Sequence, residues 1–284
     1  MAVYQPSELI AFLSDLGIRP KKALSQNFLV DGNIIRKIIS TVAISPGDVV
    51  LEIGPGPGAL TQLLLAAGAT VIAVEKDHTL AQALTRLNTP EGRLHVYEED
   101  IMEFKFDEIL APYLATGKLI KVIANLPYHL TTPIIAELVR RPELFSTLVL
   151  MVQKEVAERF TSAPDTRAYS SFTVFLNFYC HPRYAFTVSR NCFLPKPKVE
   201  SAVVALELHP APKISDETGF FKLTRTSFEH RRKMLRASLR DLYPPEKIMQ
   251  ALEEIGFPPT ARPEQLSLDD FLRLFACLSK VSIN

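Results

Sequence analysis

The chain has 284 residues, of which 47% are hydrophobic and 22% are charged. This is the composition of a globular protein with enough apolar material for a core, and it excludes an intrinsically disordered chain. The formal net charge is only +1, so affinity for a polyanion has to come from a local concentration of Lys and Arg.

The N-terminal segment has neither a basic leader nor a small-residue cleavage site, and no run approaches the ~18 uninterrupted apolar residues of a membrane span. We therefore expect a cytoplasmic monomer with no membrane contact. Cys180, Cys192 and Cys277 are odd in number, and their spacings fit neither a zinc knuckle nor a paired framework. They are expected to be reduced thiols, and no metal site is predicted.

From residue 48 onward, short apolar runs alternate with helical patterns. The helices are expected to start near Gly58 and at Asp77, to run from Thr132 to Arg140, and to include residues 154–160. Strands are expected at 48–53, 70–75, 93–97, 119–125 and 146–152. This alternation predicts βαβ units and a parallel sheet.

Two further apolar runs, 171–180 and 201–208, have no convincing helix between them, and we expect them to form an antiparallel edge. The predicted fold class is therefore α/β, with a mostly parallel Rossmann-like sheet that carries an antiparallel edge.

Residues 209–219 are rich in Pro, Gly and polar side chains, as linkers are. Beyond them the sequence predicts only helices, around 219–240, 245–255 and 267–279, and Ser267 with Asp270 forms a capping box for the last. The expected domains are a catalytic α/β domain over 1–208, a linker over 209–219 and a small all-α domain over 220–284.

A glycine-rich turn follows the first of the strands expected from residue 48 onward. Gly54, Gly56 and Ala59 satisfy the G-x-G-x-x-A pattern of dinucleotide-binding folds, and Glu75 ends the next strand, where an acid would bind ribose hydroxyls. An NAD-dependent dehydrogenase is therefore an alternative. Pro55 and Pro57 disfavour it, because each removes an N–H group that a pyrophosphate would need. The turn favours S-adenosylmethionine, which has a ribose and an adenine but no phosphate.

Two polar positions follow the next expected strands. Asp100 comes after the strand at 93–97, on the sheet edge of Glu75, where its carboxylate can accept a hydrogen bond from the cofactor's adenine amine. Asn125, Leu126, Pro127 and Tyr128 follow the strand at 119–125. The Asn125 amide oxygen and the Leu126 main-chain oxygen can accept the hydrogens of an exocyclic adenine amine, which frees its lone pair for attack on a methyl group. Pro127 would stiffen this turn and Tyr128 would stack on the target base.

Taken together, these motifs resemble the KsgA-type small-subunit ribosomal RNA adenine dimethyltransferases over nearly the whole chain. The motifs that carry the resemblance are LSQNFLVD (24–31), LEIGPGPGALT, Glu75, Asp100, NLPYHLTTP, NCFLPKPKVESAVV and RRKMLRASL.

The resemblance implies that Asn27 and Leu29 join Gly54, Glu75, Asp100 and Asn125 in lining the cofactor site. It also implies that Phe193 and Tyr128 sandwich the target adenine. Two departures from the family pattern are Ser25 in place of a glycine and His129 in place of an asparagine.

The implied reaction is transfer of methyl groups from S-adenosylmethionine to N6 of two adjacent adenines. They lie in a hairpin near the 3′ end of 16S ribosomal RNA, which is methylated during assembly of the small subunit. The large-subunit (23S) adenine methyltransferases of the macrolide-resistance type remain an alternative, because the catalytic motifs barely separate the two branches. A binding protein that has lost catalysis is disfavoured, since Glu75 and the NLPY motif are intact.

Lys and Arg are concentrated between Lys222 and Arg240, a stretch with seven basic residues and the acidic residue Glu229. On one continuous helix Arg232 and Arg236 would share a face, with Leu235 and Leu239 opposite. We therefore expect an RNA-binding stripe that contacts phosphates. Its residues are Arg231, Arg232, Lys233 and Arg236.

Overall fold

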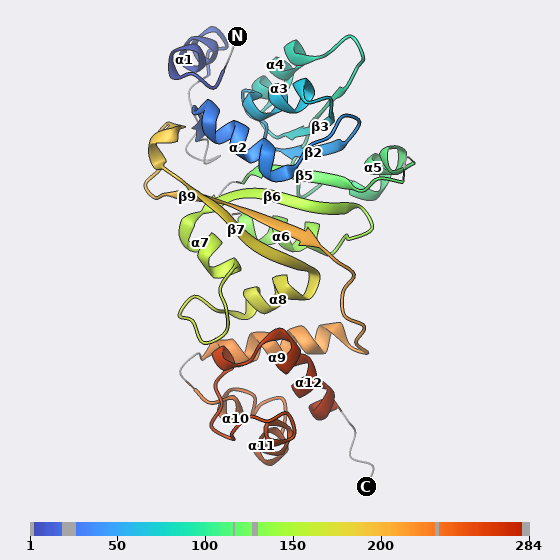
Figure 1. Ribbon diagram of the computed structural model, residues 1–284, viewed down its shortest axis with the longest axis vertical. Helices are drawn as coiled ribbons and strands as arrows, with labels where there is room; N and C mark the ends of the chain where they lie inside the picture. The colour runs from blue at the N-terminus through green and yellow to red at the C-terminus, as the bar shows by residue number, and fades with distance from the viewer. Residues whose placement is uncertain (1–2, 19–26, 116, 127–129, 231–232, 280–284) are drawn as a thin grey trace. The chain divides into compact units, whose positions relative to one another are not determined.

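The structure is a computed structural model, and it describes residues 3–18, 27–115, 117–126, 130–230 and 233–279. Two compact units can be distinguished from the contacts within the chain, the first comprising residues 1–157 and 181–209 and the second comprising 158–180 and 210–284. The elements of both units are labelled in Figure 1.

The first unit is built on a seven-stranded sheet with the order β4-β3-β2-β5-β6-β9-β7. Pairs β4-β3, β3-β2, β2-β5 and β5-β6 are parallel, whereas β9 is antiparallel to β6. The predicted parallel sheet with an antiparallel edge is confirmed. Its strands are β2 (Val49–Ile53), β3 (Thr70–Glu75), β4 (Leu94–Glu98), β5 (Ile120–Asn125), β6 (Phe145–Gln153), β7 (Cys180–Val188) and β9 (Ser201–Leu208).

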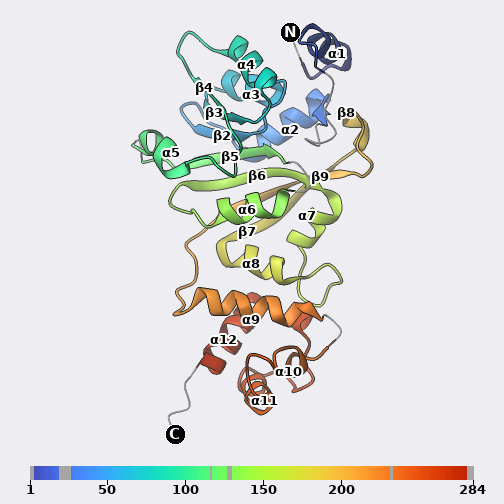
Figure 2. The ribbon, with the colours of Figure 1, turned by 180° about the vertical axis from the view of Figure 1, so that it is seen from behind.

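Helices cover both faces of this sheet, and Figures 1 and 2 show α2 and α6 on opposite faces. Consecutive residues in the inner strands, such as Val50 and Leu51 or Val71 and Ile72, point to opposite faces and are all fully buried. The helices of this unit are α1 (Pro6–Asp15), α2 (Gly32–Val42), α3 (Ala59–Ala66), α4 (His78–Leu84), α5 (Phe106–Leu114) and α6 (Thr131–Val139), while α7 (Lys154–Phe160) crosses into the second unit.

A second, two-stranded sheet joins segments far apart in the chain. β1 (Phe28–Leu29) pairs antiparallel with β8 (Phe193–Leu194), so that Leu29 lies opposite Phe193. The main-chain N–H of Val30 extends this ladder by donating to the oxygen of Cys192 at 2.8 Å. The pairing fixes the N-terminal strand of the first unit against a segment that follows β7.

The second unit is helical and has an aromatic core. It contains α8 (Ser171–Tyr179), α9 (Glu217–Glu229), α10 (Leu235–Ser238), α11 (Pro245–Glu254) and α12 (Leu268–Ser279). Rings from α8 pack on rings from α9, with centroid distances of 5.2 Å for Phe175 and Phe221 and 5.5 Å for Phe178 and Phe220. The capping box expected at Ser267 is present, because its hydroxyl accepts from the Asp270 N–H and the Asp270 carboxylate accepts from the Ser267 N–H.

The second unit differs from the expected domain in its bounds. The contacts divide the chain between residues 209 and 210, and residues 158–180 group with the C-terminal helices and not with the α/β unit. The physical reason is the aromatic face of α8, which is buried against α9.

Two expected elements are wrong. The run 171–180 is mostly the helix α8, which begins at a capping box between Ser170 and Thr173, and the edge strand β7 starts only at Cys180. The run is mostly apolar, so the helical period could not be recognised from the sequence. The helix expected over 219–240 also ends early, because α9 stops at Glu229. Met234, directly before the short α10, is extended with a ψ of 150° and so does not continue a helix.

Candidate active site

One cavity of about 260 Å³ lies in the first unit, at the carboxyl ends of the parallel strands. This edge is where open α/β sheets bind their ligands. The cavity brings together all six residues expected at a cofactor site and also Leu126. Its lining includes Asn27, Leu29, Gly54, Glu75, Asp100, Asn125 and Leu126.

The glycine-rich turn after β2 forms one wall of this cavity. Gly54, Gly56 and Gly58 all have positive φ, at 67°, 56° and 87°, and they alternate with prolines. The turn has three N–H groups, and all three are engaged within the protein. Gly54 donates to the Val74 oxygen at 2.9 Å, Gly56 to Glu75 Oε2 at 2.9 Å and Gly58 to the Pro55 oxygen at 3.0 Å.

This hydrogen bonding bears on the choice between two ligands. A pyrophosphate is bound mainly by free N–H groups at the start of a helix. The residues from Gly54 to Gly58 offer none in this structure. The wall therefore suits a ligand without phosphates, which disfavours the NAD alternative.

Glu75 ends β3 and is held by the main chain on two sides. Its Oε2 accepts from the Gly56 N–H and its Oε1 from the Asp77 N–H, both at 2.9 Å, and the residue is only 7% exposed. Burial raises the pKa of this carboxyl, while the two main-chain hydrogen bonds oppose the rise. Each oxygen retains a lone pair, so the carboxylate can still accept from a pair of ribose hydroxyls.

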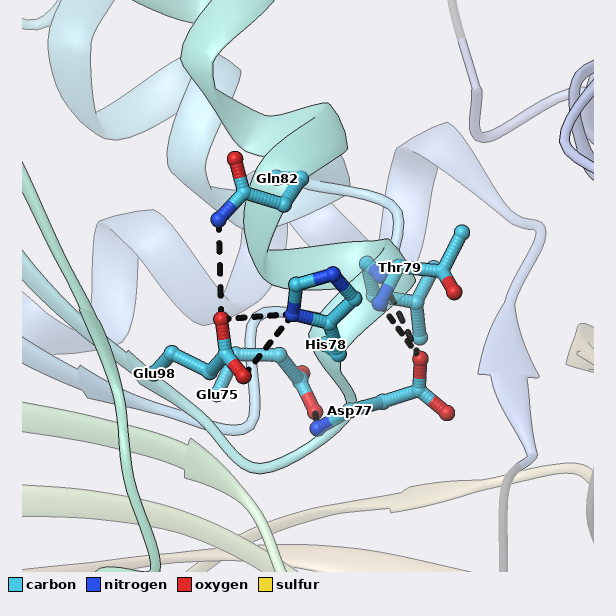
Figure 3. A network of polar contacts seen from close by, with 7 residues as sticks. Glu75, Asp77, His78, Thr79, Gln82 and Glu98 are labelled. Atoms are coloured by element: carbon cyan, nitrogen blue, oxygen red, sulfur yellow. Dashed lines mark hydrogen bonds and ion pairs between the residues drawn. The ribbon is translucent and has the colours of Figure 1, made fainter.

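The surroundings of Glu75 are a polar network at the start of α4 (Figure 3). The Asp77 carboxylate caps α4 by accepting from the N–H groups of Thr79 and Leu80, at 3.1 and 3.3 Å. His78 Nδ1 lies 2.8 Å from a carboxylate oxygen of Glu98, the residue opposite Glu75 in the β3-β4 ladder. The cap fixes the chain that follows Glu75 and, through the Asp77 N–H, the rotamer of Glu75 itself.

Asp100 lies on the same edge, after β4. Its Oδ2 accepts from Lys76 Nζ at 2.6 Å and its Oδ1 from the Met102 N–H at 3.0 Å. The hydrogen bond from Lys76 is the main cause that lowers the pKa of Asp100, so the carboxylate is ionised at neutral pH. Asp100 therefore caps the turn that follows it and also lines the cavity.

Asn125 ends β5 and connects two walls of the cavity. Its Nδ2 donates to the main-chain oxygen of Asn27 at 3.1 Å, which leaves the amide oxygen as an acceptor. Leu126 is 2% exposed, and its N–H donates to the oxygen of Met151 on β6 at 3.3 Å. Pro127, Tyr128 and His129 lie outside the described residues, so the placement of the first two, expected at this site, is not described.

Phe193 is not among the residues that line the cavity. It is 4% exposed, belongs to the apolar core of the first unit and lies opposite the cavity residue Leu29 in the β1-β8 ladder. The ladder thus brings Phe193 next to the cavity wall.

Several cavity residues were not expected from the sequence. Lys76 had a local signal, since it directly follows Glu75 and its charge is opposite to that of Asp100. Phe28 packs on the glycine-rich turn, because a Cβ on Gly56 would lie 3.2 Å from its ring. Met151 is brought in by the β5-β6 register, where it pairs with Asn125, and no local pattern marks it.

Glu52, two residues before the glycine-rich turn, was also passed over. It is 1% exposed, and its Oε2 accepts from the Thr61 hydroxyl at 2.7 Å, whereas Oε1 has no partner among the described residues. Burial raises the pKa of Glu52 to about 7. The residue lies on β2, directly before the cavity residue Ile53, and does not itself line the cavity.

The basic residues of the second unit fit the expected stripe only in part. Arg231 and Arg232 lie outside the described residues. Lys233 and Arg236 are exposed, whereas Leu235 and Leu239 are fully buried. Because α9 ends at Glu229 and α10 begins at Leu235, the described residues do not form the one continuous helix on which the expected stripe was based.

Two further observations concern the described part of the chain. It contains no cluster of three His, Cys, Asp or Glu side chains that could hold a metal ion. None of its helices combines the length and apolarity needed to cross a membrane.

The chain is similar to known proteins over nearly its whole length. The sequence model of the family described as "Ribosomal RNA adenine dimethylase" matches residues 17–280. "Ribosomal RNA small subunit methyltransferase A" of Protochlamydia amoebophila (strain UWE25) is 60% identical over 275 residues, which are 97% of each chain. The protein of the same name from Chlamydia abortus is 44% identical over 98% of this chain and 99% of the relative.

Solved structures give the same result. A dimethyladenosine transferase from Plasmodium falciparum is 29% identical with a TM-score of 0.75, covering 88% of this chain and 96% of that one. The 23S rRNA methyltransferase ErmE is 25% identical with a TM-score of 0.69, covering 89% of this chain and 100% of that one. The chain therefore belongs to the ribosomal RNA adenine dimethylase family, whose members are S-adenosylmethionine-dependent methyltransferases.

Proposed function

We propose that this protein methylates N6 of two adjacent adenines near the 3′ end of 16S ribosomal RNA, in the small ribosomal subunit, to give N6,N6-dimethyladenosine. The observation that carries the proposal is the convergence of Glu75, Asp100, Asn125 and Leu126 on one cavity at the carboxyl edge of the sheet. The choice of the small subunit is supported by the names of relatives that cover nearly the whole chain.

S-adenosylmethionine, when bound, supplies an electrophilic methyl group on a sulfonium. We assign its ribose hydroxyls to the Glu75 carboxylate and its adenine amine to the Asp100 carboxylate. Gly54 would let the main chain come close to the ligand. A Cβ added to Gly54 would have the main-chain oxygen of Asn125 as its nearest neighbour, at 3.8 Å. Asn27 and Leu29 would close the cavity from the side of β1.

Asn125 and Leu126 are assigned to the target adenine. The lone pair of an exocyclic adenine amine is delocalised into the ring, so the amine is a weak nucleophile until its hydrogens are bound. The Asn125 amide oxygen and the Leu126 main-chain oxygen would accept these two hydrogens and favour the tetrahedral nitrogen of the transition state. The hydrogen bond from Asn125 Nδ2 to Asn27 orients the amide before the substrate arrives.

The target base is assigned to aromatic side chains, Tyr128 after Pro127 on one side and Phe193 on the other. Phe193 is buried in the described structure, so this role requires that its ring become accessible to the base. Exposed Lys233 and Arg236, with Arg231 and Arg232, are assigned to RNA phosphates.

A second candidate is methylation of large-subunit RNA, which the similarity to ErmE favours.

The two candidates are distinguished by incubating labelled S-adenosylmethionine with small and with large subunits that lack the modification. The RNA is then digested to nucleosides. We expect labelled N6,N6-dimethyladenosine from small subunits only, and no label in small subunits that already carry the modification. Label in large-subunit RNA, or N6-monomethyladenosine as the end product, would contradict the proposal.

A further inference from the structure

Arg86 lies outside the cavity but is bonded to its glycine-rich wall. It belongs to the 3-10 turn η2 (Thr85–Leu87) that follows α4. Its Nη2 donates to the main-chain oxygen of Pro57 at 2.5 Å, and its Nη1 donates to the oxygen of Ala83 at 2.6 Å. Pro57 lines the cavity, whereas Arg86 does not. The guanidinium thus ties the glycine-rich turn to the end of α4.

The glycine-rich turn also packs directly on this segment. A Cβ on Gly58 would lie 2.6 Å from Leu87 Cδ1 and 2.9 Å from Leu84 Cδ2, so only a glycine permits the observed approach. Leu84 is fully buried, and its position is therefore fixed by the core. One side of the turn packs on these leucines, and the hydrogen bond from Arg86 holds the carbonyl of Pro57.

Arg86 is in turn covered by the N-terminal helix. Its Cζ lies 4.2 Å from the centroid of the Phe12 ring on α1, and Phe12 is only 7% exposed. Leu9 and Leu13 of the same helix are buried in the core of the first unit, so Phe12 is presented from a fixed helix. A planar guanidinium can stack on a ring and still donate in its own plane, which an ammonium cannot do.

We propose that Arg86 is a positioning residue that sets the conformation of the cofactor turn through the Pro57 carbonyl, and that Phe12 of α1 holds it in place. The N-terminal helix then contributes to cofactor affinity although none of its residues lines the cavity. The inference rests on the proposed cofactor site, because it concerns the wall formed by Gly54, Pro55, Gly56 and Pro57.

The proposal predicts different effects on the affinities for S-adenosylmethionine and for RNA. The turn contacts the cofactor and not the RNA, so loosening it raises the Kd and KM for S-adenosylmethionine. The KM for RNA and the rate at saturating cofactor stay the same. A different role for Arg86, as a contact to an RNA phosphate, predicts the reverse pattern and a smaller salt dependence of RNA binding.

The test uses the full-length protein and titration calorimetry with S-adenosylmethionine. We expect Arg86→Gln to raise the Kd about tenfold and Phe12→Leu about threefold, as the loss of a charge-assisted hydrogen bond and of its support implies. The double variant should bind no more weakly than Arg86→Gln alone, because Phe12 acts only through Arg86. Arg86→Lys, which keeps the charge but not the planar fork, should fall between wild type and Arg86→Gln.

Arg93→Gln is the matched control, since Arg93 also donates to main-chain oxygens, those of Leu65 and Ala69. Neither of these two acceptor residues lines the cavity, whereas Pro57 does. The inference is overturned if Arg93→Gln raises the Kd as much as Arg86→Gln. It is equally overturned if Arg86→Gln leaves the Kd unchanged, or if Arg86→Gln and Phe12→Leu are additive.

Glu75→Gln is measured beside these variants. If Glu75→Gln weakens binding and Arg86→Gln does not, only this inference fails. If neither affects binding, the proposed cofactor site itself is wrong.

Discussion

Replacing Glu75 by Gln tests the cofactor site with little change in shape. The carboxylate accepts two main-chain N–H groups, from Gly56 and Asp77, and a glutamine can accept only one of them. Its amide nitrogen must then face the other N–H or turn away, and the charge that would strengthen the hydrogen bonds from a ribose is lost. Both effects weaken cofactor binding.

The expected loss is that of one charge-assisted acceptor, ~1.5–3 kcal/mol, which corresponds to a Kd about 10- to 150-fold higher. Stability should change less than affinity, because burial raises the pKa of Glu75 and removal of the charge relieves that desolvation. Calorimetry gives the Kd, and thermal unfolding without cofactor gives the stability.

The matched control for Glu75→Gln is Glu98→Gln, because Glu98 lies opposite Glu75 in the ladder but contacts His78 at the surface (Figure 3). It should leave the Kd within about twofold of wild type. A folded Glu75→Gln protein that binds S-adenosylmethionine as tightly as Glu98→Gln does would refute the assignment of the ribose to Glu75.

Three further predictions concern stability and RNA binding. The pKa of Glu52 in the folded protein, about 7, lies above the ordinary value of 4.5 for a glutamate. Ionisation of this buried carboxyl therefore lowers stability progressively between those two pH values, and the loss is complete above them. The free energy of unfolding of Glu52→Gln, measured in urea relative to wild type, should therefore rise by up to ~3 kcal/mol from pH 4.5 to pH 8. A stability difference between variant and wild type that is the same at both pH values would contradict this. A chain that ends at residue 209 keeps α8 without α9, so it should expose Phe175 and Phe178, bind a hydrophobic dye and aggregate. As the control, the same truncated chain with a glycine-serine linker in place of residues 158–180 should remain monomeric. Replacing Lys233 and Arg236 by Ala should weaken binding to small subunits and leave the Kd for the cofactor unchanged. The slope of log K against log salt concentration should become shallower by ~0.7–0.9 for each lost phosphate contact. An unaltered slope would show that neither residue contacts a phosphate.

The sheet and the position of the site were predictable because they rest on local patterns. Each of the strands β2 to β6 is a short apolar run between helical segments, and polar residues that follow such runs must meet at one edge of a parallel sheet. Gly54, Glu75, Asp100 and Asn125 could therefore be grouped from the sequence, and the structure brings them together in one cavity.

The features that were missed depend on contacts between distant segments. The run from Phe172 to Tyr179 is mostly apolar, because its helix packs among other aromatic rings, and the four-residue spacing of its two polar residues, Thr173 and Asn177, fits a strand as well as a helix. The break after Glu229 could not be predicted from the charge pattern, which is compatible with a longer helix. The bond from Arg86 to Pro57 spans 29 positions and carries no motif.

The role assigned to Asn125 is activation of the target amine, and single-turnover methyl transfer at saturating cofactor measures that step without product release. Asn125→Ala should lower the rate by about 10²- to 10³-fold, the effect of removing one preorganised polar contact, while RNA binding persists. Asn177→Ala is the control, because Asn177 Nδ2 also donates to a main-chain oxygen, that of Thr173, but in the second unit. An Asn125→Ala protein that is folded, binds both substrates and forms N6,N6-dimethyladenosine as fast as the Asn177→Ala control would contradict the account.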